Sequence, residues 1–427
     1  MKIGGLRCVN STAGFGRSIA LTLGLAFVLT SAEPVFAADA IWDYVDASDY
    51  TKTKEGEVVT ITGNLTGRGD LSVVYVLSDS NRFSLDFESP PPGTGFWVEV
   101  FEGNGDSTGM RYSLEKTRHI KPGFVGGFYL KIYSNVGSGG WGLSYKEKEK
   151  RLIDFTWKIS FKNESGDTDV SRLEVRVPVI KTNPLYQEVV KSSTNIPYKK
   201  IDTDNLGNDF YIFEFTDFPA NGSLDIVMKY QMVLKSTYSH VKDRTGNSVP
   251  GLVKPEPLIE SNNPFIINLA RRITTGDKTD YGKMTSIYRY ILTRIEYQYQ
   301  DEMVGALKAL SSGRGDCNEF TDAVIALARA SGIPARKWNG YIYFDDNNIQ
   351  AHATTEVYLP GVGWSIVDPT MICFVARPPV YIYNYTGENP SFLADPDSEV
   401  YVYFYNTNGP KDARVSDEYT ITARELP

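Results

Sequence analysis

Apolar residues follow two different spacings along this chain. Up to about residue 240 they tend to fall on every second position, as at Phe155, Trp157, Ile159 and Phe161, which predicts β-strands with one buried face. Beyond Asn263 they recur three and four residues apart, which predicts amphipathic helices. We therefore expect a β-rich first half and helices only in the second half.

The β-rich half divides into two predicted domains at a run of charges. Strand patterns separated by Gly, Pro, Ser and Asn fill residues 38–150 and predict a β-sandwich. The charged residues 146–151 are typical of a solvated linker or strand edge. A second strand-rich stretch, 151–245, follows, and we expect it to space and orient the part of the chain beyond it.

Residues 246–380 predict an α+β domain. Asn263 and Pro264 supply an N-cap and a first-turn proline for one helix, and an apolar stripe over 284–295 predicts a second. A third helix of about four turns begins near Cys317. These helices should pack together as the core of the domain.

The last stretch, 381–427, carries further strand patterns and predicts a C-terminal β extension. Its strands would either add to the sheet of the preceding domain or cover a neighbouring one. The predicted fold class is thus multidomain: two N-terminal all-β sandwich domains, an α+β core and a C-terminal β extension.

Cys317 occupies a position that suits a nucleophile. It follows the N-cap candidate Asp316, so it falls in the first turn of a helix, where free N–H groups and a positive potential favour a thiolate. An ordinary thiol has a pKa of roughly 8.5, and such a site beside an imidazolium can lower it by several units. The same N–H groups can receive the oxyanion of a tetrahedral intermediate.

His352 and Asp368 fall on two strands that predict a hairpin. One strand runs over 351–359, turn residues 360–363 follow, and a second strand ends at Asp368. A loop of three or five residues puts His352 and Asp368 on one face, about one diagonal step apart, whereas a loop of four puts them on opposite faces unless a bulge intervenes. Asp368 can then hold one imidazole nitrogen while the other faces the thiol.

Each of these residues also has a structural interpretation. A cysteine at a helix start is often only a small hydrophobe, a histidine in a strand is often a polar edge residue, and Asp-Pro-Thr is often only a turn. The coincidence of all three in this order favours a catalytic triad of Cys317, His352 and Asp368.

These residues lie in motifs that resemble a known family. The segments that carry the resemblance are Gly315–Phe320, His352–Ala353, Glu356–Gly361, Gly363–Trp364 and Val367–Thr370. They are similar to the transglutaminase-like core, and the resemblance covers roughly residues 263–377. The second β-rich stretch also resembles the immunoglobulin-like domain that often precedes such cores in bacteria.

The resemblance implies a papain-like fold, with Cys317 as nucleophile, His352 as general base and acid, and Asp368 as the residue that orients the histidine. Papain-like enzymes often take an oxyanion donor from a loop upstream of the cysteine, and Gln298 is the candidate here. One departure is Thr354, where bacterial relatives commonly carry tryptophan. The family includes cross-linkers, proteases, amidases and inactive binders, so the resemblance implies a mechanism more than a substrate.

No cofactor or metal is predicted. The acidic run 345–348 lacks the remaining ligands and the glycine of an EF-hand loop, so a hairpin turn is the better interpretation. His119 and His240, the two other histidines, have no companions at metal-ligand spacing and are expected at the surface.

The first 37 residues predict a signal peptide. Three basic residues precede the apolar run 19–29, and Val35-Phe36-Ala37 is typical of a cleavage site, although a retained N-terminal anchor is an alternative. Removal of this segment changes the net charge from −8 to −10, since it takes away three basic residues and Glu33. We expect a secreted or periplasmic protein with no transmembrane segment after cleavage, and an acidic surface that argues against nucleic acid as a partner.

Cys317 and Cys373 are the cysteines that remain after processing. A disulfide between them would consume the proposed nucleophile, so we expect free thiols, with Cys373 as a buried small hydrophobe. A redox lock between the two is the alternative.

The sequence therefore predicts a secreted cysteine enzyme that forms an acyl-enzyme from a peptide amide. Water would then make it a protease or amidase, and an amine would make it a cross-linker. The expected partner is a peptide or protein, with cell-wall peptides as one candidate. The alternatives are a non-catalytic protein that binds a peptide in the same cleft, and a glycan-binding or adhesive role for the β domains.

Overall fold

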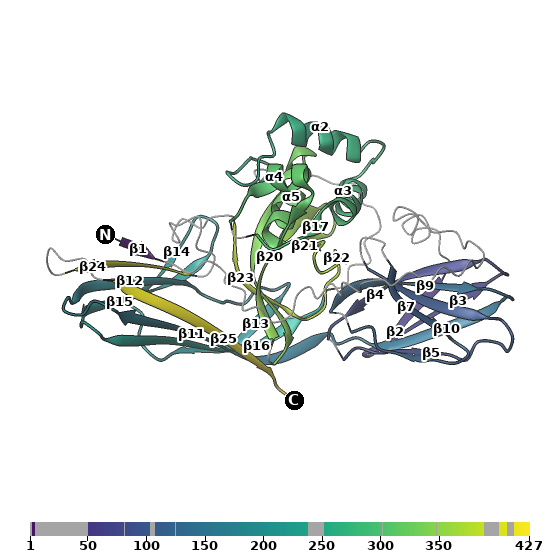
Figure 1. Ribbon diagram of the computed structural model, residues 1–427, viewed down its shortest axis with the longest axis horizontal. Coiled ribbons are helices and arrows are strands. Elements are labelled where there is room, and N and C mark those ends of the chain that lie inside the picture. Colours follow the sequence, from purple (N-terminus) through teal and green to yellow (C-terminus); the bar gives the residue numbers. More distant parts are fainter. Residues whose placement is uncertain are drawn as a thin grey trace, which may run out of the picture.

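The structure is a computed structural model that describes residues 2–4, 50–80, 82–102, 107–123, 125–237, 252–300, 302–346, 348–387, 401–407 and 414–427. Most of the predicted signal peptide therefore lies outside the described residues. Two β domains lie at opposite ends of the long axis, and a helical domain rises between them (Figure 1). Among the described residues, none of the helices has the length and apolar character required to cross a bilayer.

The first β domain is a sandwich of two antiparallel sheets. Alternation along its strands fills the space between the sheets with apolar side chains such as Val59, Leu85, Phe96, Leu130 and Leu143, all fully buried. One sheet has the order β2 (Tyr50–Glu55), β3 (Val58–Leu65), β10 (Gly139–Lys146), β5 (Leu85–Phe87), β8 (His119–Ile120). The other has the order β4 (Leu71–Ser78), β9 (Gly126–Ser134), β6 (Phe96–Phe101), β7 (Ser107–Ser113).

The second β domain is also built from two sheets, and the C-terminal part of the chain completes both. One sheet has the order β1 (Lys2–Gly4), β24 (Val402–Thr407), β12 (Val170–Pro178), β15 (Asp209–Phe218), β14 (Lys200–Thr203). The other has the order β13 (Gln187–Thr194), β16 (Ser223–Lys235), β11 (Lys150–Asn163), β25 (Val415–Glu425). Strand β25 pairs along most of β11, as Figure 1 shows in yellow, so residues close to the C-terminus stabilise a domain that begins near residue 150.

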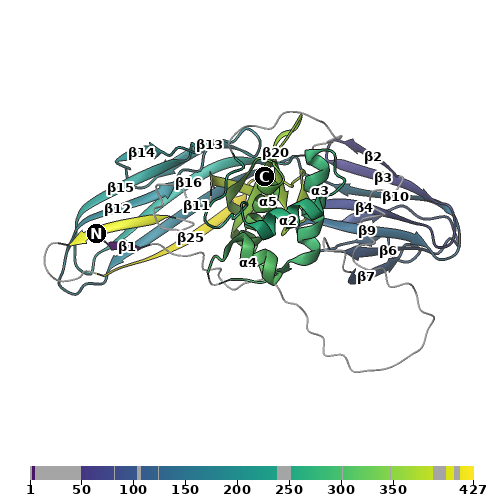
Figure 2. The same ribbon diagram turned by 90° about the horizontal axis from the view of Figure 1, so that it is seen from above.

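The third domain, the core, packs four helices against one face of an antiparallel sheet. The sheet has the order β22 (Cys373–Phe374), β21 (Gly363–Asp368), β20 (Asn348–Leu359), β19 (Ala335–Asp345), β23 (Tyr381–Thr386). The helices are α2 (Pro264–Ile273), α3 (Asp280–Arg294), α4 (Gly305–Ser312) and α5 (Cys317–Ala330). Seen from above, the helices gather over the middle of the molecule, between the two β domains (Figure 2).

The central helix of the core is α5. Most of its residues are buried, including Phe320, Val324 and Leu327, and it contacts α2, α3, α4 and the sheet. A two-stranded parallel ribbon, β17 (Glu296–Tyr297) with β18 (Arg314–Gly315), lies immediately before it. The N-terminus of α5 is therefore fixed from both the helical layer and the preceding loop.

The predicted fold class is confirmed: two β-rich domains precede an α+β core, and a β extension follows it. The extension was expected either to join the core sheet or to cover a neighbouring domain, and its strands do both. Strand β23 joins the core sheet, whereas β24 and β25 join the second β domain.

Candidate active site

Cys317 is the first residue of α5, and the turn that presents it is closely held. The side chain of Asp316 caps the helix by accepting from the Asn318 N–H (2.9 Å), and the Glu319 carboxylate accepts from the Asp316 N–H (3.1 Å). This reciprocal pair is a capping box. At Gly315 a Cβ atom would lie 2.3 Å from the Cβ of Glu319, so the box requires glycine there.

The loop upstream of the helix runs directly beside the cysteine. The Gln298 N–H donates to the Gly315 carbonyl (2.8 Å), and the Gln300 N–H donates to the Asp316 carboxylate (3.2 Å). The structure thus places the backbone of Gln298 against the residue two positions before Cys317, with its side chain exposed. Its role as an oxyanion donor stays a prediction.

His352 and Asp368 are joined by a hydrogen bond of 2.7 Å between Nε2 of the histidine and Oδ2 of the aspartate. The register explains this contact, because Leu359 pairs with Gly363 and leaves a three-residue loop, 360–362. This is one of the loop lengths that place the two side chains on the same face, one diagonal step apart. Since Nε2 is engaged, Nδ1 is the ring nitrogen left for another partner.

Asp368 is almost fully buried and receives several donors. Its Oδ1 accepts from the hydroxyl of Thr370 (2.7 Å) and from the Met371 N–H (3.1 Å), and its Oδ2 also accepts from the hydroxyl of Tyr381 (2.8 Å). Burial alone would raise the pKa of this carboxyl, but His352 and the two hydroxyls outweigh it, so the pKa lies below its usual value. Asp368 is therefore ionised at neutral pH and accepts the hydrogen bonds that hold it in place.

Tyr297, which the sequence did not single out, also belongs to this site. Its ring lies against Phe320, with 6.2 Å between ring centroids, and 45% of the residue is exposed. Partial burial raises the pKa of its phenol, and the nearby charges of Cys317 and Asp368 raise it further. The phenol thus lies within electrostatic reach of both residues. The signal in the sequence was only its place in the loop before the cysteine helix.

Two polar contacts fix α5 against the sheet behind the cysteine. The Lys337 ammonium on β19 lies 3.2 Å from the Asp322 carboxylate on α5, and both side chains are almost fully buried. The hydroxyl of Thr355 on β20 donates to the Thr321 carbonyl (3.3 Å). Breaking a buried ion pair typically costs about 3–5 kcal/mol, so this pair holds the helix in one position relative to β20, the strand that carries His352.

The remaining candidates fall outside this site. His119 lies on the first β domain with Nδ1 2.6 Å from Oδ1 of Asp86, and both side chains are exposed. His240 lies outside the described residues. Cys373 is buried, and no disulfide joins it to Cys317. Asp346 accepts from the Glu425 N–H (2.9 Å), which gives its carboxylate a structural role in the turn where calcium had been the alternative.

Within the described residues there is no group of three or more histidine, cysteine, aspartate or glutamate side chains that could hold a metal ion. The candidate site consists of a cysteine at a helix N-terminus, a part-buried histidine–aspartate pair and an exposed tyrosine. That arrangement can activate a thiol and protonate a leaving group.

Comparison with known proteins relates this region to one family. Residues 267–369 match the sequence model of the Transglutaminase-like superfamily. The uncharacterized protein YebA of Bacillus subtilis (strain 168) is 39% identical over 126 residues, which cover 24% of this chain and 17% of that protein. The chain thus matches less than a fifth of the length of that relative.

Two solved structures resemble the chain more distantly. A proposed cysteine protease from Cytophaga hutchinsonii is 20% identical, with a TM-score of 0.48 over 66% of this chain and 92% of that one. The periplasmic domain of TgpA from Pseudomonas aeruginosa is 15% identical, with a TM-score of 0.26 over 69% of this chain and 89% of that one. Both scores lie below 0.5, so the relationship rests on residues 267–369.

Proposed function

We propose, from the match of residues 267–369 to the Transglutaminase-like superfamily, that the protein is a cysteine acyl-transfer enzyme in which Cys317 is the nucleophile, His352 the general base and acid, and Asp368 the orienting carboxylate. The observation that carries the proposal is the part-buried bond between His352 Nε2 and Asp368 Oδ2, because it leaves Nδ1 for the thiol.

Acylation begins from a thiolate–imidazolium pair. The Cys317 sulfur attacks the carbonyl carbon of a peptide amide, and the oxyanion that forms is received by N–H groups at the start of α5. Gln298 is the candidate for a further donor. The imidazolium of His352 gives its Nδ1 proton to the leaving nitrogen as the C–N bond breaks, which releases an amine and leaves a thioester on Cys317.

Deacylation reverses these roles. Water or a primary amine attacks the thioester carbonyl while His352 accepts its proton, and the thiolate leaves as the C–S bond breaks. Throughout the cycle Asp368 keeps the imidazole in one orientation and stabilises its charged form. Water as acceptor makes the protein a protease or amidase, and an amine makes it a cross-linker.

The location and substrate follow from features outside the core. We place the protein outside the cytoplasmic membrane because its first 37 residues have the pattern of a signal peptide. Substrates in that compartment would be peptides or proteins, and cell-wall peptides are one candidate. The acidic net charge disfavours a nucleic-acid partner.

The reactivity of the thiol tests the proposal. Iodoacetamide should label Cys317 rapidly at pH 6, and peptide-level mass spectrometry can compare it with Cys373 in the same molecule. Burial raises the pKa of the Cys373 thiol, so this residue serves as an internal unreactive control. The His352→Ala variant should lose the fast labelling.

A second measurement identifies the reaction. The protein is incubated with a peptide library and a tagged primary amine, and the products are compared with those of Cys317→Ala. Amine incorporation that depends on Cys317 means transamidation, and cleavage without incorporation means hydrolysis. If neither occurs and Cys317 labels no faster than Cys373, the enzyme proposal fails and a peptide-binding role of the same cleft replaces it.

A further inference from the structure

The segment that follows Asp368 has a strained backbone. Residues 370–375 leave β21 and include the short edge strand β22. Ile372 and Val375 have φ angles of 54° and 62°, in the left-handed region that β-branched residues rarely adopt. Such conformations cost about 1–3 kcal/mol each and persist only where the surroundings hold them.

The strained segment supports Asp368 directly. The Thr370 hydroxyl and the Met371 N–H both donate to Oδ1 of Asp368. The other oxygen, Oδ2, serves His352. Because one carboxylate is shared between the segment and the imidazole, a displacement of the segment would turn Asp368 away from His352.

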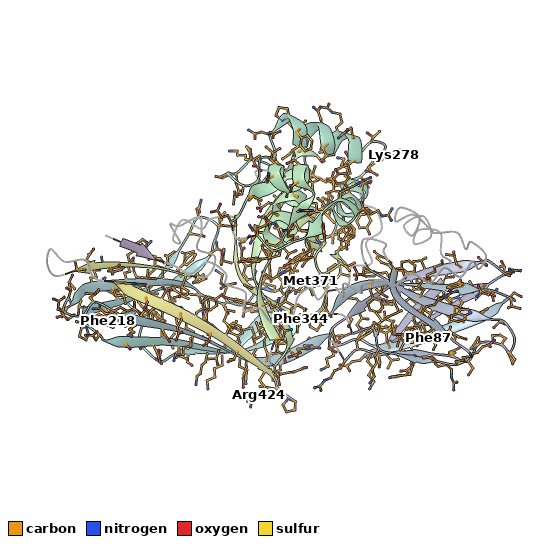
Figure 3. All side chains as sticks on the ribbon, in the orientation of Figure 1. Phe87, Phe218, Lys278, Phe344, Met371 and Arg424 are labelled. Carbon is orange, nitrogen blue, oxygen red and sulfur yellow. The ribbon has the colours of Figure 1, made fainter. Side chains whose placement is uncertain are left out.

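The first β domain contacts this same segment through backbone and hydroxyl groups. The Tyr75 hydroxyl on β4 donates to the Ile372 carbonyl (2.7 Å), and the Gly127 N–H on β9 donates to the Met371 carbonyl (2.8 Å). Met371, labelled in Figure 3, lies where the core meets this domain. Two consecutive carbonyls of the strained segment are thus each held by a donor from another domain.

The approach is too close for any residue other than glycine on β9. A Cβ atom at Gly126 would lie 2.3 Å from the Met371 carbonyl oxygen, and one at Gly127 would lie 2.1 Å from the Ile372 carbonyl oxygen. Real Cβ atoms do not approach backbone oxygens so closely, and a backbone cannot swing away as a side chain can. The glycine pair therefore matches the shape of the segment.

Hydrophobic packing keeps this contact in register. Val73, Phe101 and Tyr129 of the first β domain belong to the same buried cluster as the helices of the core. Phe374, which follows in β22, packs on Tyr288 of α3, with 5.0 Å between ring centroids. The donors of β4 and β9 are therefore held at a fixed distance from Asp368.

We propose that Tyr75 and the Gly126–Gly127 pair are positioning residues of the active site: they hold the strained 370–375 segment in the one conformation that orients Asp368 toward His352. This inference rests on the proposed function. The proposed role makes the first β domain part of the active-site structure. Its strands β4 and β9 would affect the reaction through Asp368, without touching the substrate.

Two substitutions test the inference, each with a matched control in the same domain. Tyr75→Phe removes one hydroxyl, and Tyr112→Phe does the same on β7, at the opposite edge of the sheet. Gly127→Ala introduces the clashing Cβ, and Gly67→Ala adds a methyl group where nothing lies within 4 Å. Thermal unfolding and circular dichroism first establish that each variant is folded. Tyr75→Phe keeps the test valid if Gly127→Ala does not fold.

The first readout is the pH profile of Cys317 alkylation. In Tyr75→Phe and Gly127→Ala we expect the midpoint to move toward that of an ordinary thiol, about pH 8.5, because a misdirected Asp368 stabilises the imidazolium less well. We also expect kcat to fall about tenfold or more with KM unchanged, since the substrate is not contacted. Both controls should match the unmodified protein.

The second readout does not require activity. The bond to Asp368 should give the Nε2 proton of His352 a low-field NMR signal, which Cys317→Ala should keep and His352→Ala should remove. Tyr75→Phe should weaken or shift it. If Cys317 labels rapidly in the unmodified protein but folded Tyr75→Phe and Gly127→Ala retain its alkylation profile and this signal, the positioning role is wrong and the proposed function stands. If Cys317 is unreactive in the unmodified protein, the proposed function fails, and the NMR signal still decides the positioning role.

Discussion

The two β domains contact the same core through different kinds of groups. The first uses a backbone N–H and a hydroxyl, since Gly127 donates to the Met371 carbonyl and Tyr75 to the Ile372 carbonyl, and its glycines leave no room for a side chain. The second uses side-chain amides. Gln187 both donates to the Tyr383 carbonyl and accepts from the Tyr383 N–H, each at 2.8 Å, and Asn208 bonds the carbonyl and N–H of Thr386 in the same way.

The side-chain amides act as a substitute for a neighbouring strand. Strand β23 is the last strand of its sheet, so one of its edges has backbone groups that a further strand would otherwise pair. An amide side chain carries one donor side and one acceptor side, which matches a peptide unit. Gln187 and Asn208, both buried, thus complete the ladder of β23 and fix the second β domain against it.

A charged cluster links the second domain to the strand of His352. The Tyr186 hydroxyl donates to Glu356 on β20, whose other oxygen accepts from Arg336 at 2.7 Å. The guanidinium of Arg377 lies 4.0 Å from the centre of the Tyr186 ring and 5.5 Å from that of Tyr381. Burial lowers the pKa of Arg377 to about 10, so it is still a cation at neutral pH.

The two β domains therefore have different effects on the core. The first domain holds the backbone of residues 370–375 in one conformation and so orients Asp368, whereas the second stabilises the interface through hydrogen bonds and charge. Substitutions at the two interfaces should therefore differ in what they change: the reaction rate at the first interface and the free energy of unfolding at the second.

The largest expected effect is on stability at the second interface. Glu356→Ala leaves the Tyr186 hydroxyl and Arg336 without their shared partner and opens a cavity, so we expect a loss of about 3–5 kcal/mol in the free energy of unfolding. Glu356→Gln keeps the shape and should lose less. Urea unfolding measures both. A loss below 1 kcal/mol in Glu356→Ala would show that this cluster does not stabilise the interface.

The next effect concerns the amide that completes β23. Gln187→Leu leaves the Tyr383 N–H and carbonyl buried without partners, and we expect a loss of about 2–4 kcal/mol. Gln187→Glu retains only the acceptor, so its free energy of unfolding at neutral pH should lie between those of Gln187→Leu and the unmodified protein. Residual kcat per folded molecule should stay within about twofold of the unmodified protein, in contrast to Tyr75→Phe. A fall in kcat per folded molecule well beyond twofold would show that the second interface also acts on the reaction rate.

Much of the site could be predicted because its signals are local. Asp316 and the apolar spacing after Cys317 marked the start of a helix, and the turn residues 360–363 limited the register of His352 against Asp368. Of the loops of three, four or five residues considered, the structure has the three-residue loop. Local patterns of this kind depend on neighbours within one turn or one hairpin, and a sequence shows those directly.

The rest depended on pairings between distant parts of the chain. Tyr75 meets Ile372, and Gln187 meets Tyr383, across 297 and 196 positions, so no periodicity could connect them. The strands of the C-terminal extension were recognisable, but the sheet that each joins was not, because antiparallel partners are chosen by tertiary packing. Helix α4 was also missed, since its short Gly-, Ala- and Ser-containing sequence lacks a strong apolar stripe.

A smaller effect should appear in the pH dependence of stability. The lowered pKa of Asp368 means that its contribution is present above the unfolded value and lost as the pH falls through the folded one. Glu319 behaves oppositely: burial and the charge of Asp316 raise its pKa from 4.5 to about 7, so stability falls as the pH rises from about 4.5 to 7.

Asp368 therefore lowers stability at acidic pH, and Glu319 lowers it as the pH approaches neutrality. Glu319→Gln should remove the fall in stability between pH 4.5 and 7, which amounts to about 3 kcal/mol at pH 7 before the cost of a weaker capping box. Denaturant midpoints measured across this range are the test. An unchanged slope in the variant would mean that Glu319 does not titrate there.

The smallest effect on stability is expected where the two interfaces converge, at Tyr381. Its hydroxyl donates to the same Asp368 oxygen as His352, and its ring faces Arg377. Tyr381→Phe keeps the ring and removes only the hydroxyl, so we expect a loss of about 1.5 kcal/mol and a moderate fall in kcat. In the double variant Tyr75→Phe/Tyr381→Phe the losses in log kcat should not add if both hydroxyls act by orienting Asp368, because the second substitution meets a carboxylate already displaced. Strict additivity in a double-mutant cycle would show that the two hydroxyls do not act through one shared orientation of Asp368.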